Sequence, residues 1–334
     1  MRMMESWMSR LWPEWSGTLR RRSGGWNNST YFMESRAGRA VLRIYETHRD
    51  RDKIEFEHEV LKRLAELSLP FQVPQPIPAR NGATVAETED EPPKLACLFR
   101  YIEGDSPAEE ESGYEASFGE AAGLLSAALA GVRPSLSPAY RPYYELRAAY
   151  PLCTDEALRE LCLEPPEPFR HLAAELGALY EACGDIFGRL AELERLPHQL
   201  VHGDLNASNL LLQPADRRQV AALLDFEFCT WDLRAMEPAV VLSGLVGHPE
   251  EEAAAQAFWR GFSGVVRLSR EEMEAVPLLM QLRKADVFLH FVSRFWEGTD
   301  EAPVLREQVR MLAADLGRLS SSSRRMMRMM RGGE

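Results

Sequence analysis

Two acidic motifs in the middle of the chain carry the residue types that phosphoryl transfer needs. The first is H-G-D-L-N-A-S-N at residues 202–209, and the second is L-L-D-F-E at residues 223–227. Transfer from ATP requires an acid near the acceptor hydroxyl and oxygen ligands that hold Mg²⁺ on the phosphates. We therefore expect Asp204 to be the catalytic base, and Asn209 and Asp225 to be the Mg²⁺ ligands.

The segment between the two motifs predicts a β-hairpin. Residues 210–212 form an apolar strand, residues 214–219 a turn, and residues 220–224 a returning strand. Antiparallel pairing brings the two ends of a hairpin together, so Asp225 is expected beside Asn209. We interpret His202 as structural support for the loop, with a catalytic base as the alternative. Glu227, just after the second motif, is a candidate substrate contact.

The first hundred residues predict about five strands and one helix. The loop G-G-W-N-N-S at residues 24–29 opens a hairpin whose second strand covers residues 40–45. Backbone N–H groups of such a loop can cradle phosphates, so we expect nucleotide contacts from Gly24, Gly25, Asn28 and Ser29. Arg43 on the second strand either contacts phosphate through its bidentate fork or forms a structural ion pair.

A helix over residues 54–67 follows, and it supplies the expected partner of Arg43. Glu57 is the candidate, with Glu55 and Glu59 as alternatives. Two further strands are expected at 83–87 and 95–101. The sequence G-D-S-P at residues 104–107 then marks a boundary between a β-rich part and a helical part.

The rest of the chain is predicted to be mostly helical. Asp232 and Arg234 are expected to cap the helix that follows them. Helices are expected at residues 118–129, 168–193, 239–246, 250–264, 270–296 and 302–319. The predicted organisation is an N-terminal helical segment at 1–22, a nucleotide-binding N-lobe at 23–103, a catalytic and acceptor-binding C-lobe at 104–319, and a disordered tail at 320–334.

The two ends of the chain leave alternatives open. The N-terminal helix, which holds Trp7, Trp12 and Trp15, packs on the fold or contacts a membrane surface or a partner. The Ser-, Arg- and Met-rich tail is interpreted as disordered, with a basic membrane or partner contact as the alternative.

Composition excludes several classes of protein. The 334 residues carry a net charge of −12, which argues against nucleic acid as the main partner. The five cysteines form no C-x-x-C pair, so zinc and thioredoxin-like chemistry are not expected and a reducing cytoplasm fits. No apolar run is long enough for a transmembrane helix, and residues 1–15 do not look like a signal peptide.

The motifs resemble those of the aminoglycoside phosphotransferase/choline kinase family over roughly residues 20–300. H-G-D-L-N-A-S-N and L-L-D-F-E-F carry the resemblance, supported by G-G-W-N-N-S-T-Y-F, V-L-R-I-Y-E, P-F-Q-V-P-Q-P-I-P and F-R-Y-I-E-G-D-S-P. It implies an α+β, two-lobed protein-kinase-like fold with a small β-rich N-lobe and a large helical C-lobe, using ATP and Mg²⁺. It also implies that adenine meets backbone groups of the hinge residues Phe99, Arg100, Tyr101 and Ile102.

Within that family, the chain is similar to bacterial homoserine kinases of type II and to spore-coat-associated relatives. The run F-W-R-G-F-S-G-V-V-R-L-S-R-E-E-M, continuing to residue 296, carries this similarity and puts Arg294 near the expected substrate. Three positions depart from the family pattern. Arg43 replaces the commoner Lys, Leu129 a usual His, and Glu237 a usual Asp.

We therefore expect a cytoplasmic kinase that phosphorylates a hydroxyl of a small amino acid or amino alcohol such as homoserine. An amine-bearing acceptor suits the acidic helical lobe. The alternatives are an aminoglycoside or amino-sugar phosphotransferase, and a spore-coat or scaffold protein that keeps the fold with little turnover. The sequence does not indicate an oligomeric state.

Overall fold

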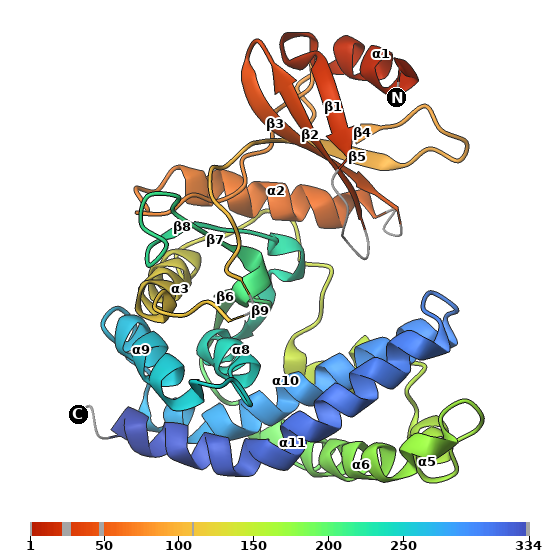
Figure 1. Cartoon of the computed structure of the whole chain (residues 1–334), viewed down its shortest axis with the longest axis vertical. Helices are drawn as coiled ribbons and strands as arrows, with labels where there is room; N and C mark the ends of the chain where they lie inside the picture. The colour runs from red at the N-terminus through yellow and green to blue at the C-terminus, as the bar shows by residue number, and fades with distance from the viewer. Residues whose placement is uncertain (1, 22–27, 47–49, 109, 332–334) are drawn as a thin grey trace. The chain divides into compact units, whose positions relative to one another are not determined.

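The computed structural model describes residues 2–21, 28–46, 50–108 and 110–331. The chain divides into two compact units. The sheet unit comprises Met1–Pro107, Gly131–Ala139 and Asn209–Glu227, and the helical unit comprises Ala108–Ala130, Tyr140–Ser208 and Phe228–Glu334. Figure 1 labels their elements. An antiparallel sheet in one unit and helices in the other confirm the predicted α+β class.

The sheet unit is built on a five-stranded antiparallel sheet with strand order β1-β2-β3-β5-β4. In the register, Thr30 lies opposite Arg43, and Arg43 lies opposite Cys97. Arg43 is therefore on a central strand. The strands are β1 (Gly17–Arg21), β2 (Asn28–Ser35), β3 (Gly38–Tyr45), β4 (Ala86–Glu87) and β5 (Leu95–Arg100).

The N-terminal helix α1 (Arg2–Leu11) and the short helix η1 (Pro13–Trp15) pack on this sheet. Trp7 and Trp12 are buried in the same apolar cluster as Leu42 and Leu98. The indole of Trp12 donates to the carbonyl of Ile77 at 2.9 Å, so its polar atom is satisfied. The packed alternative is confirmed for α1. The prediction of helix to residue 22 is wrong for Gly17–Arg21, which form strand β1.

Helix α2 (Arg51–Ala65) begins earlier than predicted because Asp50 caps it. Its carboxylate accepts hydrogen bonds from the backbone N–H groups of Asp52 and Lys53. Val60 and Leu61 on the inner face are fully buried.

The hairpin of β7 (Leu210–Leu212) and β8 (Val220–Leu223) belongs to the sheet unit, although its neighbours in sequence belong to the helical unit. Backbone hydrogen bonds attach it. Gln72 donates to Ala221 at 2.8 Å and accepts from Leu223 at 3.1 Å, and Leu212 donates to Asp105 at 3.0 Å. The metal-ligand candidates of both motifs therefore lie in the unit that carries the sheet, whereas the sequence boundaries assigned them to the C-lobe.

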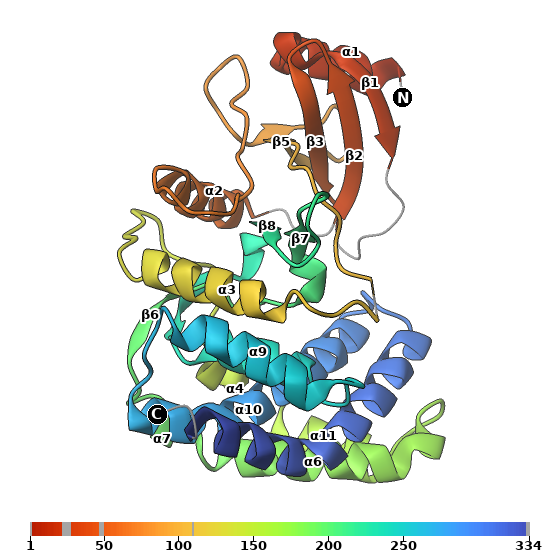
Figure 2. The ribbon, with the colours of Figure 1, turned by 60° about the vertical axis from the view of Figure 1, so that its left-hand side comes forward.

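The helical unit contains the remaining elements. Helices α10 and α11 run side by side, as do α3 and α9 (Figures 1 and 2). A two-stranded sheet is formed by β6 (His198–Val201) and β9 (Thr230–Leu233). The helices are α3 (Glu115–Leu129), η2 (Tyr143–Glu145), α4 (Leu146–Ala149), α5 (Asp155–Leu163), η3 (Arg170–Leu172), α6 (Ala173–Phe187), α7 (Leu190–Leu193), α8 (Met236–Gly244), α9 (Glu251–Ser263), α10 (Arg270–Trp296) and α11 (Ala302–Arg331).

The predicted disordered tail is wrong for residues 320–331, which continue helix α11. Their composition is polar, but Leu319, Ser323, Met326 and Met330 recur at helical spacing and are buried. Arg325 donates to Glu251 of α9 at 2.7 Å, which ties the end of the chain to another helix. Within the described residues, no helix combines the length and apolarity needed to cross a bilayer.

Met326 and Met311 test whether the end of α11 is packed. Met326 is 2% exposed and Met311 is 48% exposed on the same helix. We expect Met326→Ala to lower the free energy of unfolding by about 2–3 kcal/mol, because it leaves a cavity in the core. Met311→Ala should change it by less than about 0.5 kcal/mol. Chemical denaturation measures both, and equal small effects would mean that the end of α11 does not pack.

Candidate active site

A cavity of about 380 Å³ lies within the sheet unit. Its size is that of a small-molecule pocket. The predicted hinge residues Phe99, Arg100, Tyr101 and Ile102 all line it. Further lining residues come from the strands, from the segment after the hinge and from the hairpin, and they are Thr30, Phe32, Val41, Pro74, Gly104, Asp105, Ser106, Leu211 and Leu224.

Three of the charged residues that line this cavity are Arg43, Glu57 and Asp225. Nη1 of Arg43 lies 3.6 Å from Oδ1 of Asp225. The sequence predicted Glu57 as the partner of Arg43, and Glu57 lines the same cavity, but the ion pair of Arg43 is formed with Asp225. Asp225 of the second motif thus pairs with Arg43 of strand β3 in the lining of the cavity.

Burial and charge shift the ionisation of these groups. Burial raises the pKa of Glu57 to about 7, while the positive charge of Arg43 opposes the rise. Burial lowers the pKa of Arg43, but nearby negative charges, with that of Asp225 the strongest, raise it above its ordinary value. Arg43 is therefore a permanent cation among acids, suited to holding an anion such as phosphate.

Asn209 and Asp225 are brought together by the hairpin. The backbone N–H of Leu224 donates to the carbonyl of Asn209 at 2.8 Å, so Asp225 directly follows the residue paired with Asn209. Asp225 has φ of 65°, the left-handed region that Asp and Asn tolerate better than most residues. Its buried Oδ1 accepts no hydrogen bond from the described residues. A buried carboxylate oxygen in this state, one residue from the backbone partner of Asn209, is the kind of ligand that suits a hard cation.

Other predicted nucleotide and substrate residues are placed as follows. Gly24 and Gly25 lie outside the described residues. Asn28 and Ser29 begin β2, where Ser29 donates to Glu46 at 2.6 Å. Glu227 lies in η5 (Phe226–Phe228), buried, and its charge raises the pKa values of Lys53 and Arg43 against the lowering effect of burial.

The base candidate lies in the helical unit, at a sharp turn. Gly203 has φ of 83°, and a Cβ at this position would lie 2.7 Å from the carbonyl oxygen of Phe228. Only glycine fits both conditions. The backbone N–H of Asp204 donates to Nδ1 of the buried His202 at 3.2 Å. This hydrogen bond supports the turn that carries Asp204. Asn206 adds a brace by donating to the carbonyl of Asp204 at 3.0 Å.

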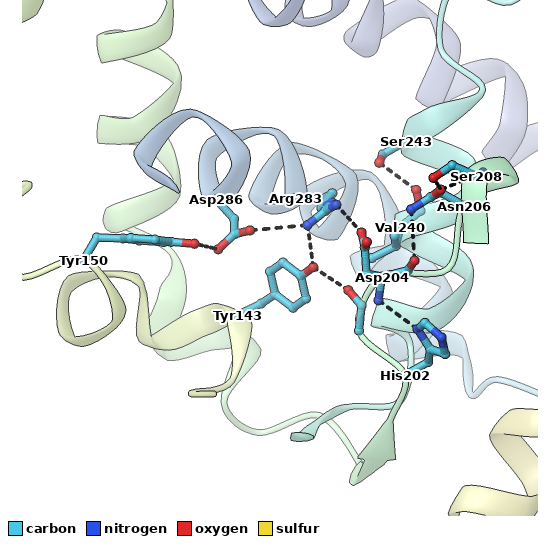
Figure 3. A network of polar contacts seen from close by, with 11 residues as sticks. Tyr143, Tyr150, His202, Asp204, Asn206, Ser208, Val240, Ser243, Arg283 and Asp286 are labelled. Carbon is cyan, nitrogen blue, oxygen red and sulfur yellow. Dashed lines mark hydrogen bonds and ion pairs between the residues drawn. The ribbon is translucent and has the colours of Figure 1, made fainter. Parts of the chain in front are cut away.

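The carboxylate of Asp204 is held by Arg283 of helix α10, and Figure 3 shows the network that follows. Nη2 of Arg283 donates to Oδ1 of Asp204, and Nη1 donates to the hydroxyl of Tyr143 at 2.7 Å. Nη1 also lies 3.4 Å from Oδ2 of Asp286, whose Oδ1 accepts from Tyr150 at 2.7 Å. The network is thus a chain of alternating donors and acceptors ending on the base candidate.

Sequence reasoning missed this network. Arg283 and Asp286 lie one helical turn apart in the R-K-A-D segment of residues 283–286, and this spacing was the available signal. Arg283 is 79 residues from Asp204 and 140 residues from Tyr143, so no local pattern joins them. Arg294, the predicted substrate residue, forms two hydrogen bonds to Asp300, at 2.6 and 2.9 Å.

The expected helix caps at Asp232 and Arg234 are wrong. The N-cap of α8 is Ala235, without a side-chain cap. Asp232 instead lies buried in β9 and accepts the backbone N–H of Tyr143 at 2.6 Å. Arg234 pairs with Glu272 at 2.7 Å.

Glu237, one of the three positions that depart from the family pattern, supports the loop of the first motif. It is 1% exposed, and its Oε1 accepts the backbone N–H of His202. Burial raises the pKa of Glu237 to about 8. The side chain therefore prefers its neutral form in the folded protein.

The pKa of Glu237 predicts a dependence of stability on pH. The folded protein keeps a proton that the unfolded chain loses near pH 4.5, so stability falls as pH rises from about 4.5 to about 8. The slope from this group is at most about 1.4 kcal/mol per pH unit. Glu237→Gln keeps the acceptor for His202 and has no proton to lose. Denaturation at pH 6, 7 and 8 should show a shallower slope for the variant, and unchanged slopes would contradict the assignment.

Comparison with known proteins agrees with this geometry. The model of the phosphotransferase enzyme family (APH) matches residues 18–279. The homoserine kinase of Brucella anthropi is 28% identical over 274 residues, which cover 79% of this chain and 76% of that protein.

Two solved structures share the fold. A microcompartment-associated aminopropanol kinase superposes with a TM-score of 0.71 at 18% identity, covering 97% of this chain and 96% of that chain. The amicoumacin kinase hAmiN, in complex with AMP-PNP, Ca²⁺ and Ami, superposes with a TM-score of 0.68 at 16% identity, covering 96% of this chain and 93% of that chain. The chain therefore belongs to the phosphotransferase enzyme family, and it is a small-molecule kinase with a kinase-like fold and an alcohol group as acceptor.

Proposed function

We propose that this kinase transfers the γ-phosphoryl group of ATP to the hydroxyl of a small amino acid or amino alcohol, with homoserine as the leading acceptor. The observation that carries the proposal is the charged network at Asp204. It places two carboxylates, those of Asp204 and Asp286, against the guanidinium of Arg283. Such a cluster suits a short acceptor that bears charges of both signs. Relatives that are homoserine kinases support the same acceptor class.

The cavity of the sheet unit is the proposed ATP site. Its apolar lining, with Val41 and Leu211 among it, suits the faces of adenine. Backbone groups of the hinge at residues 99–102, apart from the N–H groups of Arg100 and Tyr101 that donate to backbone carbonyls, would meet its edge. Arg43 would hold phosphate oxygens. The Lys that is usual at this position is a point charge, whereas the guanidinium of Arg43 can make two parallel hydrogen bonds to a phosphate.

Asn209 and Asp225 are the proposed ligands of a Mg²⁺ ion. The buried Oδ1 of Asp225 supports this role, because it accepts no hydrogen bond from the described residues and its ion-pair partner, Nη1 of Arg43, lies 3.6 Å away. Mg²⁺ typically takes one or two protein oxygens together with phosphate oxygens and water. When bound, the ion would neutralise charge on the β- and γ-phosphates.

Asp204 is the proposed base. Its carboxylate would accept the proton of the acceptor hydroxyl while the oxygen of that hydroxyl bonds to the γ-phosphorus and the bond to the bridging oxygen breaks. Arg283 orients the carboxylate by holding Oδ1. The bond from Arg283 does not use the full acceptor capacity of the carboxylate, since two oxygens offer about four lone-pair sites.

Two alternatives remain proposals. An amino-sugar acceptor would also find carboxylates at Asp204 and Asp286. A scaffold protein with little turnover would not need all three of Asp204, Asn209 and Asp225, and the chain has all three.

Use of ATP and five buried cysteines without disulfides fit a cytoplasmic location.

An acceptor panel tests the function. Purified protein with ATP and Mg²⁺ should phosphorylate L-homoserine faster than choline, glucose or kanamycin, as measured by ADP release and mass of the product. Asp204→Asn, which keeps the shape of the side chain, should lower kcat at least about 100-fold because general-base catalysis is lost. Unchanged turnover in this variant would contradict the base, and a preference for kanamycin would favour the amino-sugar alternative.

Asp225→Asn tests the metal ligand with the fold preserved, since Asn also tolerates the left-handed backbone of residue 225. We expect Mg²⁺ to strengthen ADP binding to the parent protein, and this gain to fall at least about 10-fold in the variant, with kcat falling at least about 100-fold. Titration calorimetry with and without Mg²⁺ measures the binding. Asp216→Asn in the turn of the same hairpin is the control and should change neither quantity. Equal Mg²⁺ dependence in both variants would remove Asp225 from the metal site.

A further inference from the structure

We propose that Arg283 binds a carboxylate of the acceptor, so that the enzyme prefers a short hydroxy amino acid to the amino alcohol that lacks the carboxylate. The inference rests on the proposed function and narrows it. It assigns to Arg283 two contacts at once, one to the base Asp204 and one to the substrate.

The hydrogen-bonding capacity of Arg283 supports this role. A guanidinium carries five N–H donors. In the described structure, Nη2 donates to Asp204 and Nη1 donates to Tyr143 and faces Asp286. These contacts do not use every N–H, and the side chain remains 21% exposed. A planar group with donors left at a partly open site matches the geometry of a carboxylate.

The guanidinium is fixed before any substrate arrives. Tyr143 accepts from it and donates to the carbonyl of Gly203 at 2.5 Å, in the turn that carries the base. Asp286 lies 3.4 Å from it on the same helix and is itself held by Tyr150. A receptor held in this way loses little further conformational freedom on binding, which favours affinity.

Charge decides between the two classes of acceptor. An amino alcohol carries only an ammonium group, and its hydroxyl on Asp204 would bring that cation close to the guanidinium of Arg283. A hydroxy amino acid adds a carboxylate, which the guanidinium attracts. When both carboxylates are ionised, the two carboxylates and one guanidinium carry one negative charge in excess, and the ammonium group of a zwitterion can face it.

Spacing restricts the acceptor to a short one. The side chains of Arg283 and Asp204 are in direct contact, at 2.5 Å between Nη2 and Oδ1. An acceptor that reaches both must therefore carry its hydroxyl and its carboxylate within a few bonds of each other. Homoserine, with two carbons between its hydroxyl-bearing carbon and its carboxyl carbon, meets this condition.

The test compares matched acceptors. L-homoserine, L-homoserinamide and 3-aminopropan-1-ol share the hydroxyl and the amine, and only the first has the carboxylate. For the parent protein we expect kcat/KM to be about 10- to 100-fold higher for homoserine than for either analogue, the ratio that one charge-assisted pair supplies. In Arg283→Gln the ratio should fall to within about threefold, mostly through a higher KM for homoserine.

Two further variants keep the test decisive. Arg283→Lys keeps the charge but loses the fork, so its ratio should lie between those of the parent and Arg283→Gln. Arg270→Gln, at the exposed start of the same helix, is the matched control and should keep the parent ratio. Melting temperature and ADP binding confirm that each variant is folded, and the comparison of acceptors on the parent protein needs no variant.

The outcomes separate the two levels of the proposal. If the parent protein phosphorylates homoserine and 3-aminopropan-1-ol equally well, Arg283 does not bind a carboxylate of the acceptor. The same conclusion follows if Arg283→Gln keeps the kcat/KM ratio of the parent protein. In both cases the proposed function stands. If none of the three acceptors is phosphorylated but an amino sugar is, the proposed function itself is overturned and this inference with it.

Discussion

The attachment of one hairpin to the sheet unit determines which residues line the proposed ATP cavity. Backbone hydrogen bonds from Gln72 and Asp105 to the strands β7 and β8 hold the segment Asn209–Glu227 against elements that lie more than a hundred residues earlier. Through them, Asp225 reaches Arg43 and the cavity gains Leu211 and Leu224. These bonds are between backbone groups, so they depend on strand geometry more than on the identity of the side chains.

A second organising feature is the way buried acids are compensated in the helical unit. Asp204 and Asp286 meet a guanidinium, whereas Asp232 and Glu237 meet backbone N–H groups. Burial raises the pKa of Asp232 to about 7 and that of Glu237 to about 8, so the second pair is prone to protonation near neutrality. Of the two acids next to the permanent cation, Asp204 is the one proposed to act as a base, whereas Asp232 and Glu237 can accept backbone N–H groups in their neutral form as well.

The sequence was informative where function is encoded in short motifs. H-G-D-L-N-A-S-N and L-L-D-F-E identified the family chemistry, the resemblance that they carry implied the α+β class, and helical periodicity predicted helix α10. It was uninformative where long-range packing decides. No local sequence pattern predicts the network of Arg283, Tyr143 and Asp286. The polar composition of residues 320–331 predicted disorder, although these residues form a helix with Met326 and Met330 on its buried face. The unit to which the hairpin belongs also depends on pairing with Gln72, which no local rule predicts.

The left-handed backbone at Asp225 has an evolutionary consequence. Among uncharged residues, Asn and Gly are those that such a backbone tolerates most readily. Each is reached from an aspartate codon by one nucleotide change. A descendant of this chain could therefore lose the acidic oxygens at one step and still fold. If Asp225 is the metal ligand proposed above, one such change gives a folded chain that lacks this ligand, and a survey of duplicated genes should look first at residue 225.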